Sequence, residues 1–128
     1  MNNDERKTKD MLEHELYTII EKTDNAVRIQ LHPDSEIFRA HFPGNPVTPG
    51  VCQVGIIGEL ASKFSGKRLD LCDIKILKYI DILRPSKELV EVVFDKMEED
   101  ENLLTAKGTV ASEGRVFTKF SLIFKILS

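Results

Sequence analysis

Near the middle of the chain, His41 and Glu59 have side chains that can transfer protons, and Gly50 lies between them. Together these residues could support proton transfer on a carbonyl compound. Histidine titrates near neutral pH, so His41, held in a stretch that prolines stiffen, is a candidate general base. Gly50 follows Pro49 at a predicted helix start, where backbone N–H groups can donate to an oxygen that gathers negative charge. Glu59 lies further along the same predicted helix, and its carboxyl group could act as the acid.

A proline-rich loop and one helix must hold these groups. Residues 33–50 contain four prolines, which forbid a continuous helix or a central strand, so we expect a long shaped loop. From residue 51 to about residue 64 the pattern turns helical. Gly55 and Gly58 each weaken this helix by up to about 1 kcal/mol relative to alanine, which predicts close packing there. The apolar residues that recur at spacings of three and four are Val51, Val54, Ile57, Ala61 and Phe64.

The rest of the chain predicts the strands of an antiparallel sheet. Residues 26–31 alternate between apolar and polar types, as a strand with one buried face does. The acidic run 98–101 is expected at a solvated hairpin tip. Because a single apolar helix needs a surface that covers it, this order of elements predicts an α+β domain whose curved sheet wraps the helix. The expected strands cover residues 16–20, 26–31, 69–83, 89–97, 103–111 and 115–127, with a bulge near Leu77.

Length and composition limit the possible functions. At 128 residues the chain fits one domain, which we place at 13–128 after a polar tail at 1–12. The net charge of −3 argues against a nucleic-acid partner. Two cysteines, Cys52 and Cys72, are too few for a disulfide framework or a structural zinc site, and we expect neither a metal ion nor another cofactor. The polar start is unlike a signal peptide, and no apolar run approaches the ~20 residues that span a membrane, so we expect a cytoplasmic protein without a membrane partner.

The segment His41-Phe42-Pro43-Gly44-Asn45-Pro46-Val47-Thr48-Pro49-Gly50-Val51 resembles the signature H-F-P-G-x-P-x-x-P-G-V of the FabA/FabZ type of 3-hydroxyacyl-acyl-carrier-protein dehydratase. The segment Ile80-Asp81-Ile82-Leu83-Arg84-Pro85 is similar to the strand of that family that ends in an Arg-Pro turn. With the order of strands, the resemblance covers about residues 16–127.

This resemblance implies a fold, an activity and a partner. The fold is the hot-dog fold, an antiparallel sheet of five to six strands around one central helix. The activity is dehydration of 3-hydroxyacyl thioesters to trans-2-enoyl thioesters in fatty-acid, lipid or polyene synthesis, with His41 as the catalytic histidine. The implied partners are an acyl carrier protein that bears the substrate and a second copy of the chain, in a homodimer or a dimer-based oligomer.

The chain departs from the family pattern at the acid. The acidic partner of the histidine usually stands fourteen residues after it, and that position is Gly55 here. The next carboxylate on the helix is Glu59, one turn further on, and helical side chains lean towards the N-terminus, so Glu59 would reach back over Gly55. We therefore predict His41 and Glu59 as the catalytic pair. Four residues are predicted to bind substrate: Gly50, where the substrate approaches the main chain, and Phe38, Val51 and Val54, which line an apolar channel for the acyl chain.

Two alternatives remain open from the sequence. A thioesterase on the same fold would use Glu59 to activate water and Gly50 to hold the thioester carbonyl. A catalytically silent acyl-binding or partner subunit would have lost its acid at Gly55. A Glu59 carboxylate that shares an apolar tunnel with His41 favours an enzyme, and one that points to solvent favours the silent subunit.

Overall fold

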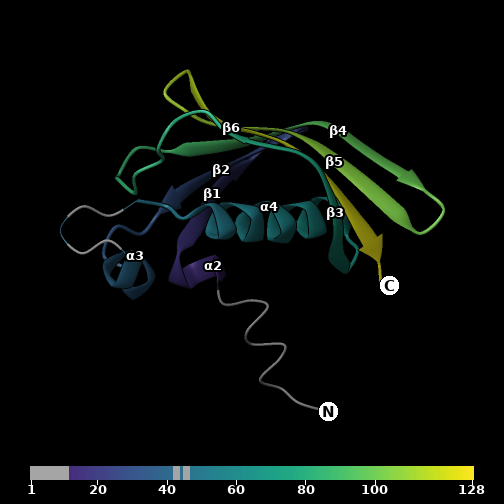
Figure 1. Ribbon diagram of the computed structural model, residues 1–128, viewed down its shortest axis with the longest axis horizontal. Coiled ribbons are helices and arrows are strands. Elements are labelled where there is room, and N and C mark those ends of the chain that lie inside the picture. The colour runs from purple at the N-terminus through teal and green to yellow at the C-terminus, as the bar shows by residue number, and fades with distance from the viewer. Residues whose placement is uncertain (1–11, 42–43, 45–46) are drawn as a thin grey trace, which may run out of the picture.

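The computed structural model describes residues 12–41, 44 and 47–128. Its main feature is one six-stranded antiparallel sheet in the order β1-β2-β4-β5-β6-β3. The sheet curves over the helix α4, which runs along its concave side, and the short helices α2 and α3 lie beyond α4 (Figure 1). The strands are β1 (Tyr17–Lys22), β2 (Ala26–Leu31), β3 (Leu69–Tyr79), β4 (Val90–Asp100), β5 (Leu103–Ser112) and β6 (Arg115–Ile126). This is the sheet-wrapped helix of the hot-dog fold.

The central helix α4 (Gly50–Ser65) begins one residue before the predicted start and ends at Gly66, whose φ of 69° suits a glycine cap. Its buried face differs from the predicted stripe, because Val51 is 77% exposed. Sheet curvature, which the spacing of apolar residues does not report, decides which helical face is covered. The residues on the buried face are Cys52, Gln53, Ile56, Ile57, Leu60 and Ala61.

The structure departs from the predicted elements most clearly in three places. Within the stretch expected to be a loop, residues between Pro33 and Pro43 form α3 (Glu36–His41), since prolines outside a short segment do not interrupt its hydrogen bonds. Strand β4 runs through the acidic stretch predicted as a tip, and the reversal falls on Glu101, whose φ is 57°. Strand β3 ends at Tyr79, and its register shifts lie between residues 71 and 73 and between 74 and 76, before the position expected near Leu77.

The N-terminal edge of the described chain is the irregular turn α2 (Leu12–Glu15), in which His14 has a φ of 75°. This turn leads directly into β1 and contacts α4. The segment 12–17 therefore lies on the helix side of the sheet. In the part of the chain that the structure describes, no helix has the length and apolar character needed to cross a membrane.

Candidate active site

The predicted base, His41, is the last residue of α3. Its side chain lies outside the described part of the structure, as do Phe42, Pro43, Asn45 and Pro46 of the motif. The chain is described again from Val47, two residues before Pro49 and the start of α4. The backbone thus carries the motif from the end of α3 to the N-terminus of the central helix.

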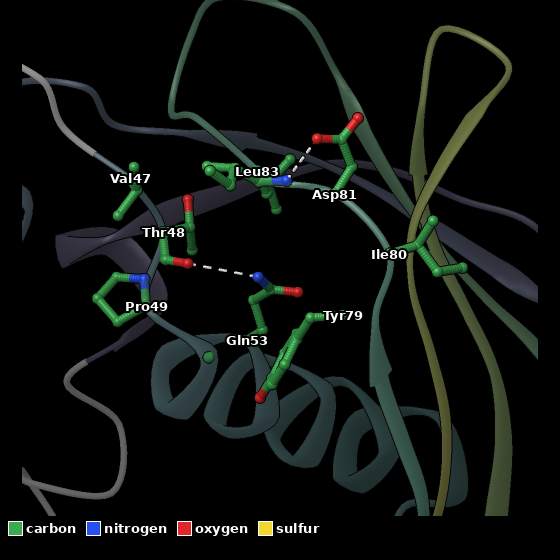
Figure 2. A pocket seen from close by; sticks show the side chains of 10 residues that line it. Val47, Thr48, Pro49, Gln53, Tyr79, Ile80, Asp81 and Leu83 are labelled. Carbon is green, nitrogen blue, oxygen red and sulfur yellow. Dashed lines mark hydrogen bonds between the residues drawn. The ribbon is translucent and has the colours of Figure 1, made fainter.

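A buried polar brace fixes the N-terminus of α4. Gln53 is 5% exposed, and its side-chain Nε2 donates to the backbone oxygen of Thr48 at 3.3 Å (Figure 2). The hydroxyl of Thr118, on β6, donates to Gln53 Oε1 at 2.6 Å. The backbone N–H of Thr48 donates to the Leu83 carbonyl oxygen at 2.7 Å. The first turn of the helix is therefore tied both to the sheet and to the chain that follows β3.

A cavity of about 590 Å³ opens beside this helix end. The ring of Tyr79 lies over the first turn of α4 (Figure 2), where a Cβ at Gly50 would overlap the phenol group. The Tyr79 phenol therefore fills the space over Gly50, and a side chain at position 50 would displace it. Burial raises the pKa of Tyr79, so its hydroxyl stays protonated at neutral pH. The lining residues are Val47, Thr48, Pro49, Gly50, Gln53, Tyr79, Ile80, Asp81, Ile82 and Leu83.

The predicted acid, Glu59, lies in a second cavity, a groove of about 610 Å³ between α4, the turn α2 and residues of β3 and β6. Glu59 is half-buried, and the Tyr17 hydroxyl donates to its Oε1 at 2.7 Å. Tyr17 itself is fully buried. Burial first, and then the hydrogen bond and negative charge of Glu59, raise the pKa of Tyr17 far above its usual range, so the phenol is a permanent donor.

The N-terminal turn occupies the place where the family pattern has its acid. A Cβ built at Gly55 would lie 2.5 Å from Leu12 Cδ1, so the Leu12 side chain fills the space over this glycine. Next to Leu12, a Glu13 carboxylate oxygen lies 2.8 Å from Lys63 Nζ. This ion pair links α2 to α4 about one helical turn after Glu59. The helix face thus keeps a carboxylate at 59 and has an apolar cover at 55.

The predicted substrate-binding residues divide between different places. Gly50 lines the first cavity, whereas Val51 and Val54 line the groove that also holds Glu59. Phe38 has no exposed surface and belongs to the main core. Its role in substrate binding, like the pairing of His41 with Glu59, stays a prediction.

Sequence reasoning missed two residues of this site. Tyr17 stands 42 positions before Glu59, and no local pattern reports a contact of that range. Gln53 is the second, and its side-chain carbonyl and amide ends are both hydrogen-bonded inside the fold. The position of Gln53 next to the apolar face of the predicted helix indicates that its side chain has hydrogen-bond partners inside the fold, since buried polar groups need them.

The side chains near the two cavities supply general acid–base groups. Among the described residues, no group of three or more His, Cys, Asp or Glu side chains is arranged to hold a metal ion. The chemistry that this part of the site can support is proton transfer by Glu59 and hydrogen-bond donation from the N-terminus of α4.

Comparison with known proteins agrees with these features. A family model described as ApeI-like, ApeI dehydratase, matches residues 18–115. The 3-hydroxyacyl-acyl-carrier-protein dehydratase FabZ of Ligilactobacillus salivarius is 35% identical over an alignment of 101 residues that covers 73% of this chain and 71% of that protein. The corresponding FabZ of Oenococcus oeni is 34% identical over 101 residues, with the same two shares.

Solved structures share the fold. A chain of the dehydratase heterocomplex ApeI:P from Xenorhabdus doucetiae superposes with a TM-score of 0.62 at 20% identity, covering 88% of this chain and 99% of that one. A hypothetical thioesterase from Streptococcus pneumoniae, solved with coenzyme A, superposes with a TM-score of 0.68 at 10% identity, covering 99% of this chain and 98% of that one. At these identities the likeness concerns the fold, which dehydratases and thioesterases share.

Proposed function

Because the chain belongs to the ApeI-like dehydratase family, we propose that it dehydrates 3-hydroxyacyl thioesters to trans-2-enoyl thioesters. The observation that carries the proposal is the Glu59 carboxyl group, held by a buried phenol in a groove along the central helix. A carboxylate solvated at the helix flank would favour a silent subunit. Glu59 instead has a fixed partner and a cavity in front of it.

The reaction removes one water molecule from the substrate. His41, as a neutral imidazole, takes the proton from C2, and the electron pair of that bond forms the C2=C3 double bond. Glu59 gives its proton to the C3 hydroxyl, which leaves with the C3–O electron pair as water. The site ends with a protonated His41 and an ionised Glu59, and exchange with solvent returns both groups to their starting states.

The N-terminus of α4 stabilises the charge that develops on the thioester carbonyl oxygen. The first backbone N–H groups of a helix can point towards a bound anion. In α4 the N–H of Cys52 already donates to the Pro49 carbonyl oxygen at 3.0 Å, so the proposed donors are those of Gly50 and Val51. Val51, in the first turn of α4, lines the groove that holds Glu59, and the Gln53 brace holds this turn still. Donors that are fixed before the reaction need no rearrangement as the charge appears.

A second copy of the chain completes the proposed assembly. Strand β3 lies at one edge of the sheet, so one side of its backbone can pair with another strand. Its exposed apolar side chains include Ile74 and Ile76, at 46% and 48% exposure, and the segment after it exposes Ile82 at 57%. A homodimer with β3 next to its symmetry mate would cover this edge and these side chains.

The substrate is proposed to arrive on an acyl carrier protein. Lys63, Lys67 and Arg68 stand at the C-terminal end of α4 and just after it, where they can complement an acidic carrier. Lys63 and Arg68 also line the groove that holds Glu59. Comparing carrier-protein and coenzyme A thioesters of the same acyl group tests this choice of carrier.

The proposed function is tested by the product. Purified protein is incubated with 3-hydroxyacyl-carrier-protein substrates of several lengths, and the carrier is analysed by intact-mass spectrometry. Loss of one water with the thioester intact is the expected result, and His41→Ala should abolish it. Release of the free hydroxy acid would indicate the thioesterase instead, and unchanged substrate at every length would indicate a silent subunit.

A further inference from the structure

The contact between Tyr17 and Glu59 joins two distant parts of the chain. Tyr17 is the first residue of β1 and is fully buried, while Glu59 lies in the second half of α4 and is half-buried. The distance of 2.7 Å between the phenol oxygen and Glu59 Oε1 is that of a strong hydrogen bond. The tyrosine ring cannot move without disturbing the core, so the position of the hydroxyl is set by the fold.

We propose that Tyr17 is the positioning residue for Glu59, a role that rests on the proposed function of Glu59 as the acid. With Gly55 in place of the usual acid and Leu12 over it, the carboxyl group at 59 needs a support of its own. Tyr17 supplies this support from the start of β1. It acts through Glu59 and does not itself touch the reacting atoms.

The donor also acts on the charge that appears during the reaction. Because Oε1 accepts the phenol hydrogen, the proton that the acid gives away is carried by Oε2. As this proton leaves, negative charge grows on the carboxylate, and the hydrogen bond from Tyr17 becomes a stronger, charge-assisted one. The interaction is therefore stronger in the transition state than in the ground state, which is the condition for a gain in kcat.

The Glu13–Lys63 ion pair and the Leu12 contact with Gly55 give this support a rigid frame. Both belong to the turn immediately before Tyr17, and both contact α4 within one turn of Glu59. The turn, the start of β1 and the helix thus form one unit. Loss of the phenol oxygen alone leaves this frame in place, which makes Tyr17→Phe the informative substitution.

The test compares Tyr17→Phe, Glu59→Gln and the double variant with the wild-type protein on a 3-hydroxyacyl-carrier-protein substrate. Tyr17→Phe should lower kcat by about 10- to 100-fold with KM nearly unchanged, since a displaced acid affects the transition state more than binding. In the Glu59→Gln background the same change should have no further effect on kcat. Val27→Ala, a core change on β2 that lines neither cavity, serves as the control for lost stability and should keep kcat.

Two outcomes overturn the proposal in distinguishable ways. If Glu59→Gln is slow while Tyr17→Phe turns over at the wild-type rate, Tyr17 is structural and the acid role of Glu59 stands. If Tyr17→Phe lowers kcat equally in both backgrounds, its effect does not pass through Glu59. Urea unfolding of the same four proteins tests the contact without any turnover, because the losses of unfolding free energy in Tyr17→Phe and Glu59→Gln should not add in the double variant. Additive losses would show that the contact is absent in solution, whether or not the protein is a dehydratase.

Discussion

Gln53→Leu should lower the free energy of unfolding by about 2 to 4 kcal/mol, because it leaves two buried polar groups without a hydrogen-bond partner. Each such group costs about 1 to 3 kcal/mol, and the group with the longer bond costs less. Gln53 is 5% exposed and joins two groups, the Thr118 hydroxyl at 2.6 Å and the Thr48 backbone oxygen at 3.3 Å. Leucine has a similar volume, so packing changes little. Both polar partners, however, lose the group that satisfied them.

The double variant Gln53→Leu/Thr118→Val separates this explanation from a packing defect. Thr118 has no exposed surface, so its hydroxyl has no access to bulk water when Gln53 is removed. Valine has the shape of threonine without the hydroxyl, and removing both partners together avoids the unsatisfied donor. The double variant should therefore be more stable than Gln53→Leu alone by about 1 kcal/mol or more.

Urea unfolding followed by far-ultraviolet circular dichroism measures these differences, since the chain has no tryptophan for fluorescence. All variants must be compared at one protein concentration because assembly would contribute to stability. If the unfolding free energies lost in Gln53→Leu and in Thr118→Val add in the double variant to within about 0.5 kcal/mol, the reasoning is refuted, because independent sites behave in that way.

The other predictions concern the acid position, the sheet edge and the pH dependence of stability. In the Glu59→Gln background, Gly55→Glu should restore turnover only weakly, because a Cβ at position 55 would lie 2.5 Å from Leu12 Cδ1. Adding Leu12→Ala should increase the restored rate, and equal rates with and without Leu12→Ala would contradict this explanation. Ile76→Lys should convert the proposed dimer to a monomer in light scattering, because the charge would be buried in the interface, and a monomeric wild-type protein would refute the dimer. Because the pKa of Tyr17 is raised in the folded protein, the unfolded chain loses this proton first as the pH rises. Tyr17 should therefore cause no pH dependence of the unfolding free energy near neutral pH and a fall of up to about 1.4 kcal/mol per pH unit above about pH 10. Circular dichroism at increasing pH should show a smaller fall in Tyr17→Phe.

The central helix and the strands could be predicted because each has a strong local pattern. Residues 26–31 alternate and form β2 with the predicted bounds, and the helix predicted at 51–64 is α4 with one residue added at each end. The family signature placed Gly50 at the start of that helix, which the structure confirms. Boundaries failed where local signals were misleading, as at α3, which fits between prolines, and in β4, whose exposed end tolerates the acidic run.

The arrangement around Glu59 could not be predicted, because it depends on contacts between distant residues. Nothing in the sequence near Tyr17 indicates that its hydroxyl meets a helix 42 positions later. Gly55 was interpreted as the loss of an acid, and the structure adds that Leu12 occupies the vacated space. The exposure of Val51 has the same origin, since the curvature of the sheet decides which helical face is covered.

The acid role of Glu59 is tested most directly by changing the leaving group at C3. Hydroxide needs a proton to depart, whereas fluoride is a far weaker base and leaves without one, so a 3-fluoroacyl thioester makes the acid unnecessary but still requires the base. Glu59→Gln should lose about 10²- to 10⁴-fold in kcat on the 3-hydroxyacyl substrate and remain close to the wild-type rate on the 3-fluoroacyl substrate. His41→Ala should be slow on both. An equal loss by Glu59→Gln on the two substrates would contradict the assignment of Glu59 as the acid.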